Sequence, residues 1–230
     1  LTVRGTPAYS STLVVGTTGM GKTTMALQFV AAGIAAGERC VYLTFHETQG
    51  QLLHKASSFR MDLRGAVESG ALAFLRVPAA ETDVDDVLHA LVADVENRAV
   101  SRVIIDTLNP LERDAAYEDR FTSILATLTS VLRDRRATTL MLREMTQLIT
   151  QDLDLSEGRE AYWTPLDNLM LLRPVETGGS VGRIITVLKV RNSDHGKRIY
   201  GFTIGERGVE VGEALQGLQG SLMGLPRRDA

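Results

Sequence analysis

Short apolar runs recur along the first two thirds of the chain and are separated by longer, more polar segments. The runs lie at residues 11–16, 40–45, 70–77, 101–108 and 137–142. Each is apolar at consecutive positions rather than at alternate ones, which is typical of strands buried on both faces of a parallel sheet. The pattern therefore predicts five parallel strands.

The segments between these runs have the periodicity of helices. Residues 22–36 form one helical stretch, which we expect to end at Gly37. Two further segments place apolar residues on one helical face, at Val84, Val87, Leu88, Leu91, Val92 and Val95, and at Phe121, Ile124, Leu125, Leu128, Val131 and Leu132. The alternation of strand and helix predicts an α/β fold in which helices cover both faces of the sheet.

The pattern changes after about residue 151. Strand-like segments at 168–175, 182–191 and 198–204 are separated by the turn-forming sequences ETGGS and NSDHGK, as in antiparallel hairpins. We therefore expect antiparallel strands to extend the sheet at its C-terminal side. Residues 1–230 are predicted to form a single domain, with a loose tail at 220–230.

Composition adds three limits to this picture. A chain of 230 residues with 44% hydrophobic content can bury one sizeable core. With 25 Lys and Arg against 28 Asp and Glu, the net charge of -3 gives no broad electrostatic reason to bind nucleic acid or an anionic membrane. No apolar run approaches the roughly 20 residues that span a bilayer, and no secretory signal is visible, so we expect a cytoplasmic protein.

The strongest motif is GTTGMGKT, which comes directly after the first predicted strand and opens the first predicted helix. It matches G-x-x-x-x-G-K-[ST], whose glycines let backbone N–H groups point at phosphate oxygens beside the positive end of a helix. We expect ATP here, with Lys22 on the β- and γ-phosphates and Thr23 on Mg²⁺. The binding residues are Gly16, Thr17, Thr18, Gly19, Met20, Gly21, Lys22, Thr23 and Thr24.

A partner for the metal stands at the end of the fourth predicted strand, in the sequence VIIDT. Asp106 ends an apolar run at the sheet edge that also carries the phosphate loop. A carboxylate oxygen there is a suitable ligand for a hard cation such as Mg²⁺, either directly or through water. Asp106 therefore has the character of a Walker B residue, although an aspartate that caps the next helix is the alternative.

The ordered blocks GTTGMGKTTMALQF, VYLTFHET, SFRMDL, RVIIDTL, RATTLML and LKVRNSDHGKRIYGFTI resemble the KaiC family of RecA-like P-loop ATPases. The resemblance spans nearly the whole chain. It implies a RecA-like core, ATP with Mg²⁺, and a ring, usually hexameric, with nucleotide between neighbouring subunits. Family members often carry two such domains, and LQGSLMGLP is similar to the segment just after the second, so the chain resembles a C-terminal copy within a longer protein.

The resemblance also assigns roles to residues outside the phosphate loop. Lys189 and Arg191 match the family's late motif and would reach a neighbouring subunit's γ-phosphate, with His195 and Lys197 as modulators. Glu47 matches the glutamate that orients the attacking water. His46 stands where the family usually has a first glutamate, and a neutral imidazole can position Glu47 or water without adding negative charge.

Three classes of function remain open at this point. The leading hypothesis is an ATP-hydrolysing ring that acts as a nucleotide-driven signalling switch for protein partners. Resemblance to the clock protein's C-terminal domain adds serine/threonine autokinase activity, with Thr164 as the candidate phosphoryl acceptor; Trp163 replaces the serine beside it. The alternatives are a RecA-like DNA-binding recombination or repair ATPase, which the charge balance and low aromatic content disfavour, and a weakly hydrolysing ATP-binding scaffold.

Overall fold

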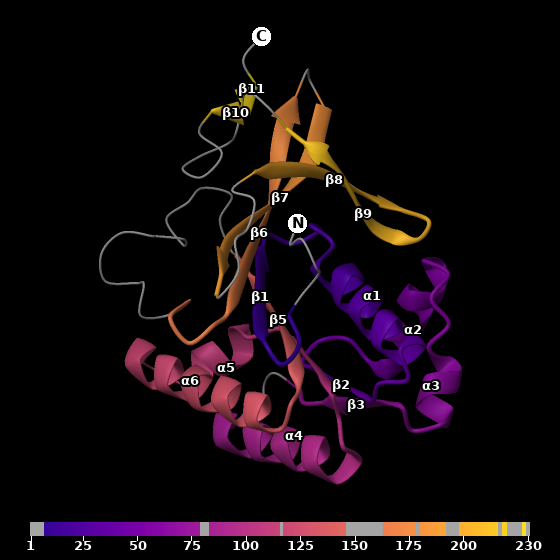
Figure 1. Cartoon of the computed structure of the whole chain (residues 1–230), viewed down its shortest axis with the longest axis vertical. Coiled ribbons are helices and arrows are strands. Elements are labelled where there is room, and N and C mark those ends of the chain that lie inside the picture. The colour runs from indigo at the N-terminus through magenta and orange to yellow at the C-terminus, as the bar shows by residue number, and fades with distance from the viewer. Residues whose placement is uncertain are drawn as a thin grey trace.

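One twisted sheet runs through the molecule, and the phosphate-loop strand lies near its middle (Figure 1). The computed structural model describes residues 7–78, 83–115, 117–145, 163–177, 180–191, 198–215, 218–219 and 227–228. The strand order is β3-β2-β4-β5-β1-β6-β7-β8-β9. The strands are β1 (Ser11–Gly16), β2 (Cys40–Thr44), β3 (Leu72–Arg76), β4 (Arg102–Asp106), β5 (Thr138–Glu144), β6 (Asn168–Thr177), β7 (Ser180–Val190), β8 (Ile199–Gly205) and β9 (Gly208–Ala214). Two short strands, β10 (Leu218–Gln219) and β11 (Arg227–Arg228), pair with each other, and β11 also pairs with β6.

The five strands predicted from the apolar runs are all present and all parallel. The three predicted C-terminal strands form the expected antiparallel series β6, β7 and β8, and β9 continues it. The prediction was incomplete at one point, because β6 also pairs with β1 in the parallel direction, with Gly16 opposite Leu172. The antiparallel extension is therefore joined directly to the phosphate-loop strand.

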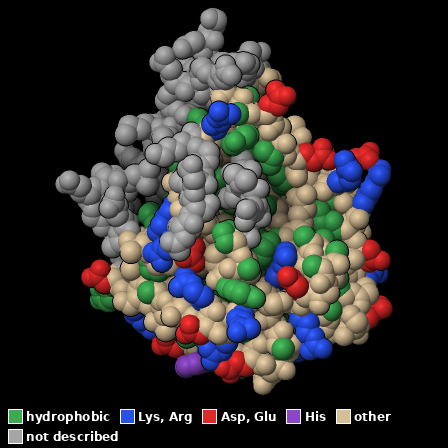
Figure 2. All heavy atoms as spheres, in the orientation of Figure 1, with side chains coloured by type: hydrophobic (Ala, Val, Ile, Leu, Met, Phe, Trp, Pro, Cys, Tyr) green, Lys and Arg blue, Asp and Glu red, His purple; other side chains and the backbone are tan. Residues whose placement is uncertain are grey.

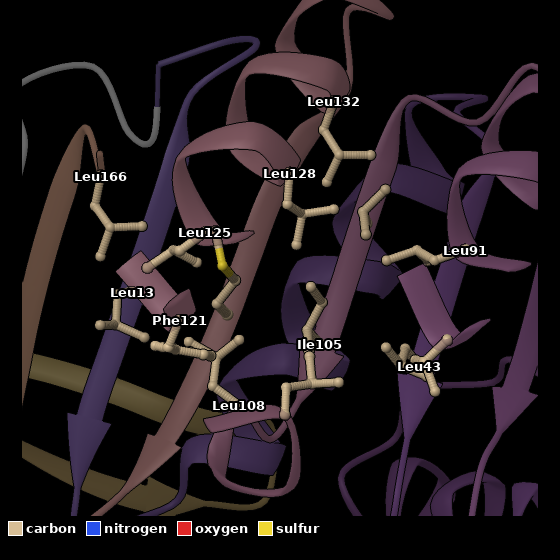
Figure 3. Packing of buried hydrophobic residues seen from close by; sticks show 14 of the residues in the cluster. Leu13, Leu43, Leu91, Ile105, Leu108, Phe121, Leu125, Leu128, Leu132 and Leu166 are labelled. Carbon is tan, nitrogen blue, oxygen red and sulfur yellow. The ribbon is translucent and has the colours of Figure 1, made fainter. Parts of the chain in front are cut away.

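Helices cover the two faces of the sheet in two groups. One group comprises α1 (Lys22–Ala35), α2 (Gln49–Ser58) and α3 (Arg64–Glu68), and the other α4 (Val84–Arg98), α5 (Asn109–Asp114) and α6 (Glu118–Asp134). Successive residues of a strand point to opposite faces of the sheet. Leu13 and Ile105 therefore pack with α4, α5 and α6 (Figure 3). Val14 and Ile104 pack on the other face with α1 and its neighbours. Burial on both faces explains why the strand sequences are continuously apolar.

Local sequence fixes where the helices near the site begin. The hydroxyl of Thr48 accepts from the backbone N–H of Gln51, whose side chain accepts in return from the N–H of Thr48, so α2 starts with a complete capping box. Asp83 caps α4 by accepting from the N–H groups of Asp85 and Asp86. Helices α2, α3 and α5 and strand β9 were not among the elements predicted, because their short sequences lack a sustained periodicity.

The surface visible in Figure 2 carries Lys and Arg side chains interspersed with Asp and Glu. Ion pairs such as Arg120–Asp85 and Arg135–Glu96 join surface charges of opposite sign. Within the part of the chain that the structure describes, no helix is long and apolar enough to cross a membrane.

Candidate functional site

The phosphate loop connects β1 to α1 and needs glycine at two points for steric reasons. A side chain at Gly16 would place its Cβ 2.9 Å from the carbonyl oxygen of Leu172 on the neighbouring strand. Gly21 has a φ of 86°, and a Cβ there would come within 2.7 Å of Ile204 Cδ1. Gly21 is also the N-cap of α1, so the backbone turns tightly and then presents the first N–H groups of a helix.

Lys22, the first residue of α1, folds back over this loop. Its Nζ donates hydrogen bonds to the carbonyl oxygens of Gly16 at 2.8 Å and Thr17 at 2.9 Å. Burial lowers the pKa of the Lys22 ammonium, while the carboxylates of Glu144 and Asp106 act in the opposite direction. The two hydrogen bonds hold the lysine on the loop, where phosphate oxygens can engage it.

Asp106, at the end of β4, is hydrogen-bonded to Thr23, the other residue that the sequence predicts as a metal ligand. Its Oδ2 accepts from the Thr23 hydroxyl at 3.0 Å and from the buried Tyr42 hydroxyl at 2.7 Å. Burial raises the pKa of the Asp106 carboxyl, and the hydrogen bonds from Tyr42 and Thr23 partly offset this. Two hard oxygen ligands thus converge beside Lys22, which fits Mg²⁺.

Glu47 lines the same cavity as Asp106 and directly precedes Thr48, the N-cap of α2. Its backbone is fixed by Thr44, whose hydroxyl donates to the Glu47 carbonyl at 3.1 Å. Its carboxylate accepts from Lys55 Nζ at 2.6 Å. The ion pair orients the carboxylate and offsets its charge, which favours a position beside phosphate oxygens.

His46 is exposed at the junction of two cavities. One, of about 480 Å³, is lined by phosphate-loop residues between Thr18 and Thr24 together with Glu47, Lys55 and Asp106. The other, of about 440 Å³, shares His46, Thr107 and Glu144 with the first and extends toward Arg113 and Arg143. The exposed imidazole therefore lies beside Glu47, at the rim of the site rather than at its base.

Three residues of the site were missed by sequence reasoning. Glu144 ends β5 between the phosphate loop and Asp106, accepts a hydrogen bond from Thr18, and is held through its backbone by Asn109. The others are Tyr42, whose hydroxyl donates to Asp106, and Lys55, which forms an ion pair with Glu47. The predicted strand 137–142 stopped two residues before Glu144, and a strand that reached the phosphate-loop edge would have exposed it.

The residues present fit Mg²⁺-ATP. The loop offers backbone N–H groups and Lys22 to the phosphates, while Thr23 and Asp106 offer oxygen atoms to a divalent cation. Thr24 also lines this cavity, as do Gly19 and Gly21. The cavity is large enough for a nucleotide, since small-molecule sites commonly measure about 300–1,000 Å³.

Lys189 and Arg191 lie far from this phosphate loop. Lys189 pairs with Leu169 on β6, and Leu169 pairs with Leu13 on β1, three residues before Gly16. At about 3.3 Å per residue and about 4.8 Å per strand, the Cα atoms of Lys189 and Gly16 are about 14 Å apart. Both cationic side chains point to the carbonyl oxygen of Thr164, with bonds of 3.4 Å from Lys189 and 2.9 Å from Arg191. The two side chains therefore lie on the same side of the strand, and they cannot reach the phosphate loop of their own chain without rearrangement.

Two of the predicted residues, His195 and Lys197, lie outside the described residues. Thr164 is described, and its side chain is exposed beside Lys189 and Arg191. It lies at the sheet edge opposite the chain's own phosphate loop. The candidate acceptor and the two candidate trans cations thus form one group.

Removing the Tyr42 hydroxyl will make activity more sensitive to acid. Asp106 must be ionised to bind a metal ion, and Tyr42→Phe removes a hydrogen bond that lowers the Asp106 pKa, so the carboxyl will protonate at higher pH. Burial and the nearby carboxylates raise the pKa of Tyr42 well above its ordinary value, so it stays a donor in this range. We expect the acidic limb of the pH profile for kcat/KM to move up by about one pH unit.

The control for this change is Tyr117→Phe, since the Tyr117 side chain is exposed. It should leave the pH profile where it is. An acidic limb that stays in place in Tyr42→Phe, with Mg²⁺-dependent turnover retained, would show that Asp106 does not control metal binding.

Comparisons with known proteins agree with this geometry. A family model described as "ATPase: KaiC" matches residues 1–216. The chain is 31% identical over 214 residues to "Circadian clock protein KaiC3" of Synechocystis sp., an alignment that covers 93% of this chain and 42% of that protein. It is 28% identical over 216 residues to "Circadian clock oscillator protein KaiC" of Thermostichus vulcanus, covering 94% of this chain and 41% of that protein. The chain thus spans less than half the length of these relatives.

Proposed function

Because the chain belongs to the KaiC family of ATPases, we propose that it binds and hydrolyses Mg²⁺-ATP in a ring of identical subunits. In this proposal the phosphate loop of one subunit binds each nucleotide, and Lys189 and Arg191 of the next subunit complete the site. The nucleotide state then controls the shape of the ring and its binding to protein partners. A hexamer is the size that the family resemblance implies.

The observation that carries this proposal is the position of the two cations. Lys189 and Arg191 stand at the opposite end of the strands from the chain's own phosphate loop, and their side chains contact Thr164. A head-to-tail contact between identical subunits brings opposite surfaces together and closes into a ring when the rotation allows. Such a contact can deliver these cations to a neighbouring γ-phosphate.

Each residue then has a defined part in hydrolysis. Lys22 binds the phosphate oxygens, and bound Mg²⁺, held by Thr23 and Asp106, would neutralise charge that develops on them. Glu47 accepts a hydrogen bond from the attacking water and takes its proton as the water oxygen bonds to the γ-phosphorus. Arg191 and Lys189 from the next subunit stabilise the remaining charge on the phosphoryl oxygens. The bond between the γ-phosphorus and the oxygen that bridges it to the β-phosphate breaks, and ADP and inorganic phosphate leave. Glu47 then releases its proton to solvent, which restores the site.

The DNA-binding alternative has less support. In Figure 2 the visible face shows charges of both signs rather than a continuous basic surface. The net charge is -3 and aromatic residues make up 5% of the chain, whereas single-stranded DNA sites combine basic grooves with stacking aromatics. DNA binding that persists at moderate salt would favour this alternative over a signalling ring.

The proposal is tested by measuring ATP turnover and particle mass on the same sample, with and without Mg²⁺. We expect Mg²⁺-dependent release of phosphate from particles larger than one subunit. A monomer that hydrolyses ATP as fast as the assembled particles would contradict the proposal that two subunits share each site. Stable ATP occupancy without phosphate release would instead indicate the weakly hydrolysing scaffold.

Restoring a glutamate beside Glu47 should raise turnover. His46→Glu adds a second carboxylate at the rim of the cavity, where a neutral imidazole now supplies hydrogen bonding but no negative charge. We expect kcat to rise by about threefold with little change in KM, which steady-state kinetics will show. The matched control is His54→Glu on α2. A fall in kcat for His46→Glu would show that the histidine itself takes part in the mechanism.

We further propose Thr164 as the acceptor for autophosphorylation. Its side chain is exposed in the same group as Arg191, at the edge that would face a neighbouring nucleotide. After incubation with Mg²⁺-ATP, mass spectrometry should detect a phosphate group on Thr164. The same measurement on Thr164→Ala should detect no phosphate at this position. Turnover without phosphate on the protein would limit the activity to hydrolysis.

A further inference from the structure

A short segment from Trp163 to Asp167 holds Lys189 and Arg191. These are the two cations proposed to act on a neighbouring subunit's γ-phosphate, and we call them the finger cations. Lys189 Nζ donates to the carbonyl oxygen of Trp163 at 3.0 Å, and Arg191 Nη2 donates to that of Thr164 at 2.9 Å. Arg191 Nη1 lies 3.6 Å from Asp167 Oδ1, and the Arg191 backbone N–H donates to the Asp167 carbonyl at 2.8 Å. The direction in which Arg191 leaves β7 therefore depends on this segment.

The Asp167 carboxylate is itself fixed from the other side. Its Oδ2 accepts from the backbone N–H and hydroxyl of Ser11 at 2.9 and 3.0 Å, and from Arg133 at 2.8 Å. Burial alone would raise the pKa of this carboxyl, but the hydrogen bonds from Ser11 and Arg133 hold it below its ordinary value. An ionised, buried carboxylate with three donors on Oδ2 presents Oδ1 to Arg191.

The same carboxylate limits repulsion between the two cations. Burial and the nearby Arg191 charge lower the pKa of Lys189, whereas the Asp167 charge raises it. Without that charge, Lys189 and Arg191 would repel each other next to the Thr164 carbonyl oxygen that both now share. Asp167 thus sets both the orientation and the spacing of the pair.

We propose that Asp167 is a positioning residue for hydrolysis in the neighbouring subunit, acting through Arg191 rather than on nucleotide. This inference rests on the proposed function, because it takes Arg191 to be the finger. Asp167 lies beside Ser11, at the start of β1, and so away from its own phosphate loop at the end of that strand. Its effect must pass through the residues that it holds.

The test is a double-mutant cycle on the assembled protein. Asp167→Asn keeps the shape of the side chain and removes its charge, so we expect kcat to fall by about tenfold with KM for ATP little changed. Adding Asp167→Asn to Arg191→Ala should lower kcat no further, since the path through Arg191 is already lost. Losses that multiply in the double variant would show that Asp167 acts apart from the finger and would overturn the inference.

Two controls separate positioning from simple structural support. Arg133→Gln removes one of the three donors on Asp167 Oδ2 but leaves both Ser11 donors and the carboxylate charge that faces Arg191, so we expect a lower melting temperature but a fall in kcat of less than about twofold. An equal loss of kcat in Arg133→Gln and Asp167→Asn would contradict the inference. Asp94→Asn, on the exposed side of α4, controls for the substitution itself.

The cycle also separates this inference from the proposed function. If Arg191→Ala keeps full turnover, the finger assignment fails and the role of Asp167 fails with it. If Arg191→Ala loses turnover but Asp167→Asn does not, the finger stands and the inference alone is overturned. Should Asp167→Asn not fold, Asp167→Glu keeps the charge and displaces the carboxylate by one methylene, and an unchanged kcat for that variant would overturn the inference.

Discussion

Glu47→Gln will lower ATP turnover by about 100-fold and leave ATP binding nearly unchanged, because an amide can keep a hydrogen bond but cannot take a proton from water. Glu47 lines the same cavity as Thr23 and Asp106, and its carboxylate is oriented by Lys55 at 2.6 Å. Single-turnover hydrolysis measured beside nucleotide binding will separate the chemical step from affinity. The loss should appear in the chemical step.

The matched control for this change is Glu68→Gln, an exposed glutamate on α3. It should hydrolyse ATP at the parental rate. Full single-turnover activity in Glu47→Gln would remove Glu47 from the mechanism and direct attention to Glu144, whose carboxylate accepts a hydrogen bond from Thr18 of the phosphate loop.

Arg191→Ala will lower turnover by at least about tenfold without weakening the protein's own phosphate loop, because an arginine supplied by a neighbour acts on the charge of the transition state. In the structure this side chain contacts Thr164 and Asp167 rather than Lys22 or Asp106. We therefore expect ATP still to bind. Turnover and nucleotide affinity measured on the assembled variant will show this separation.

Arg207→Ala is the matched control, since Arg207 is an exposed arginine between β8 and β9 that pairs with Glu210 at 3.6 Å. Its turnover should equal that of the parent. A loss of assembly in Arg191→Ala would have a different cause from a loss of chemistry, so particle mass is measured with each rate. Parental turnover in assembled Arg191→Ala would refute the finger role.

Much of the fold could be predicted from the sequence because its signals are strong and local. Continuous apolar runs indicated the five parallel strands, and the match to the KaiC family confirms the predicted RecA-like P-loop fold. The phosphate loop and Asp106 were recognisable because each comes directly after a strand end with the expected residue types. The structure places Thr23 and Asp106 in direct contact, and their role as metal ligands stays a prediction.

The rest depends on contacts between residues distant in sequence. Tyr42 and Asp106 are joined by a hydrogen bond between β2 and β4, which no local pattern reveals because Tyr42 reads as an ordinary core residue. Glu144 was hidden by a strand boundary placed two residues too early. Asp167 takes its importance from Ser11, Arg133 and Arg191, which lie on three other parts of the chain.

The central claim is that neighbouring copies share each ATP site, and mixing two defective variants tests it most directly. Lys22→Ala disables the phosphate loop but keeps the finger, whereas Arg191→Ala keeps the loop and lacks the finger. In rings assembled from equal amounts, about a quarter of the contacts combine an intact loop with an intact finger. We therefore expect the mixture to recover about a quarter of parental turnover, although each variant alone is nearly inactive. A mixture no more active than the mean of its two components would contradict a shared site.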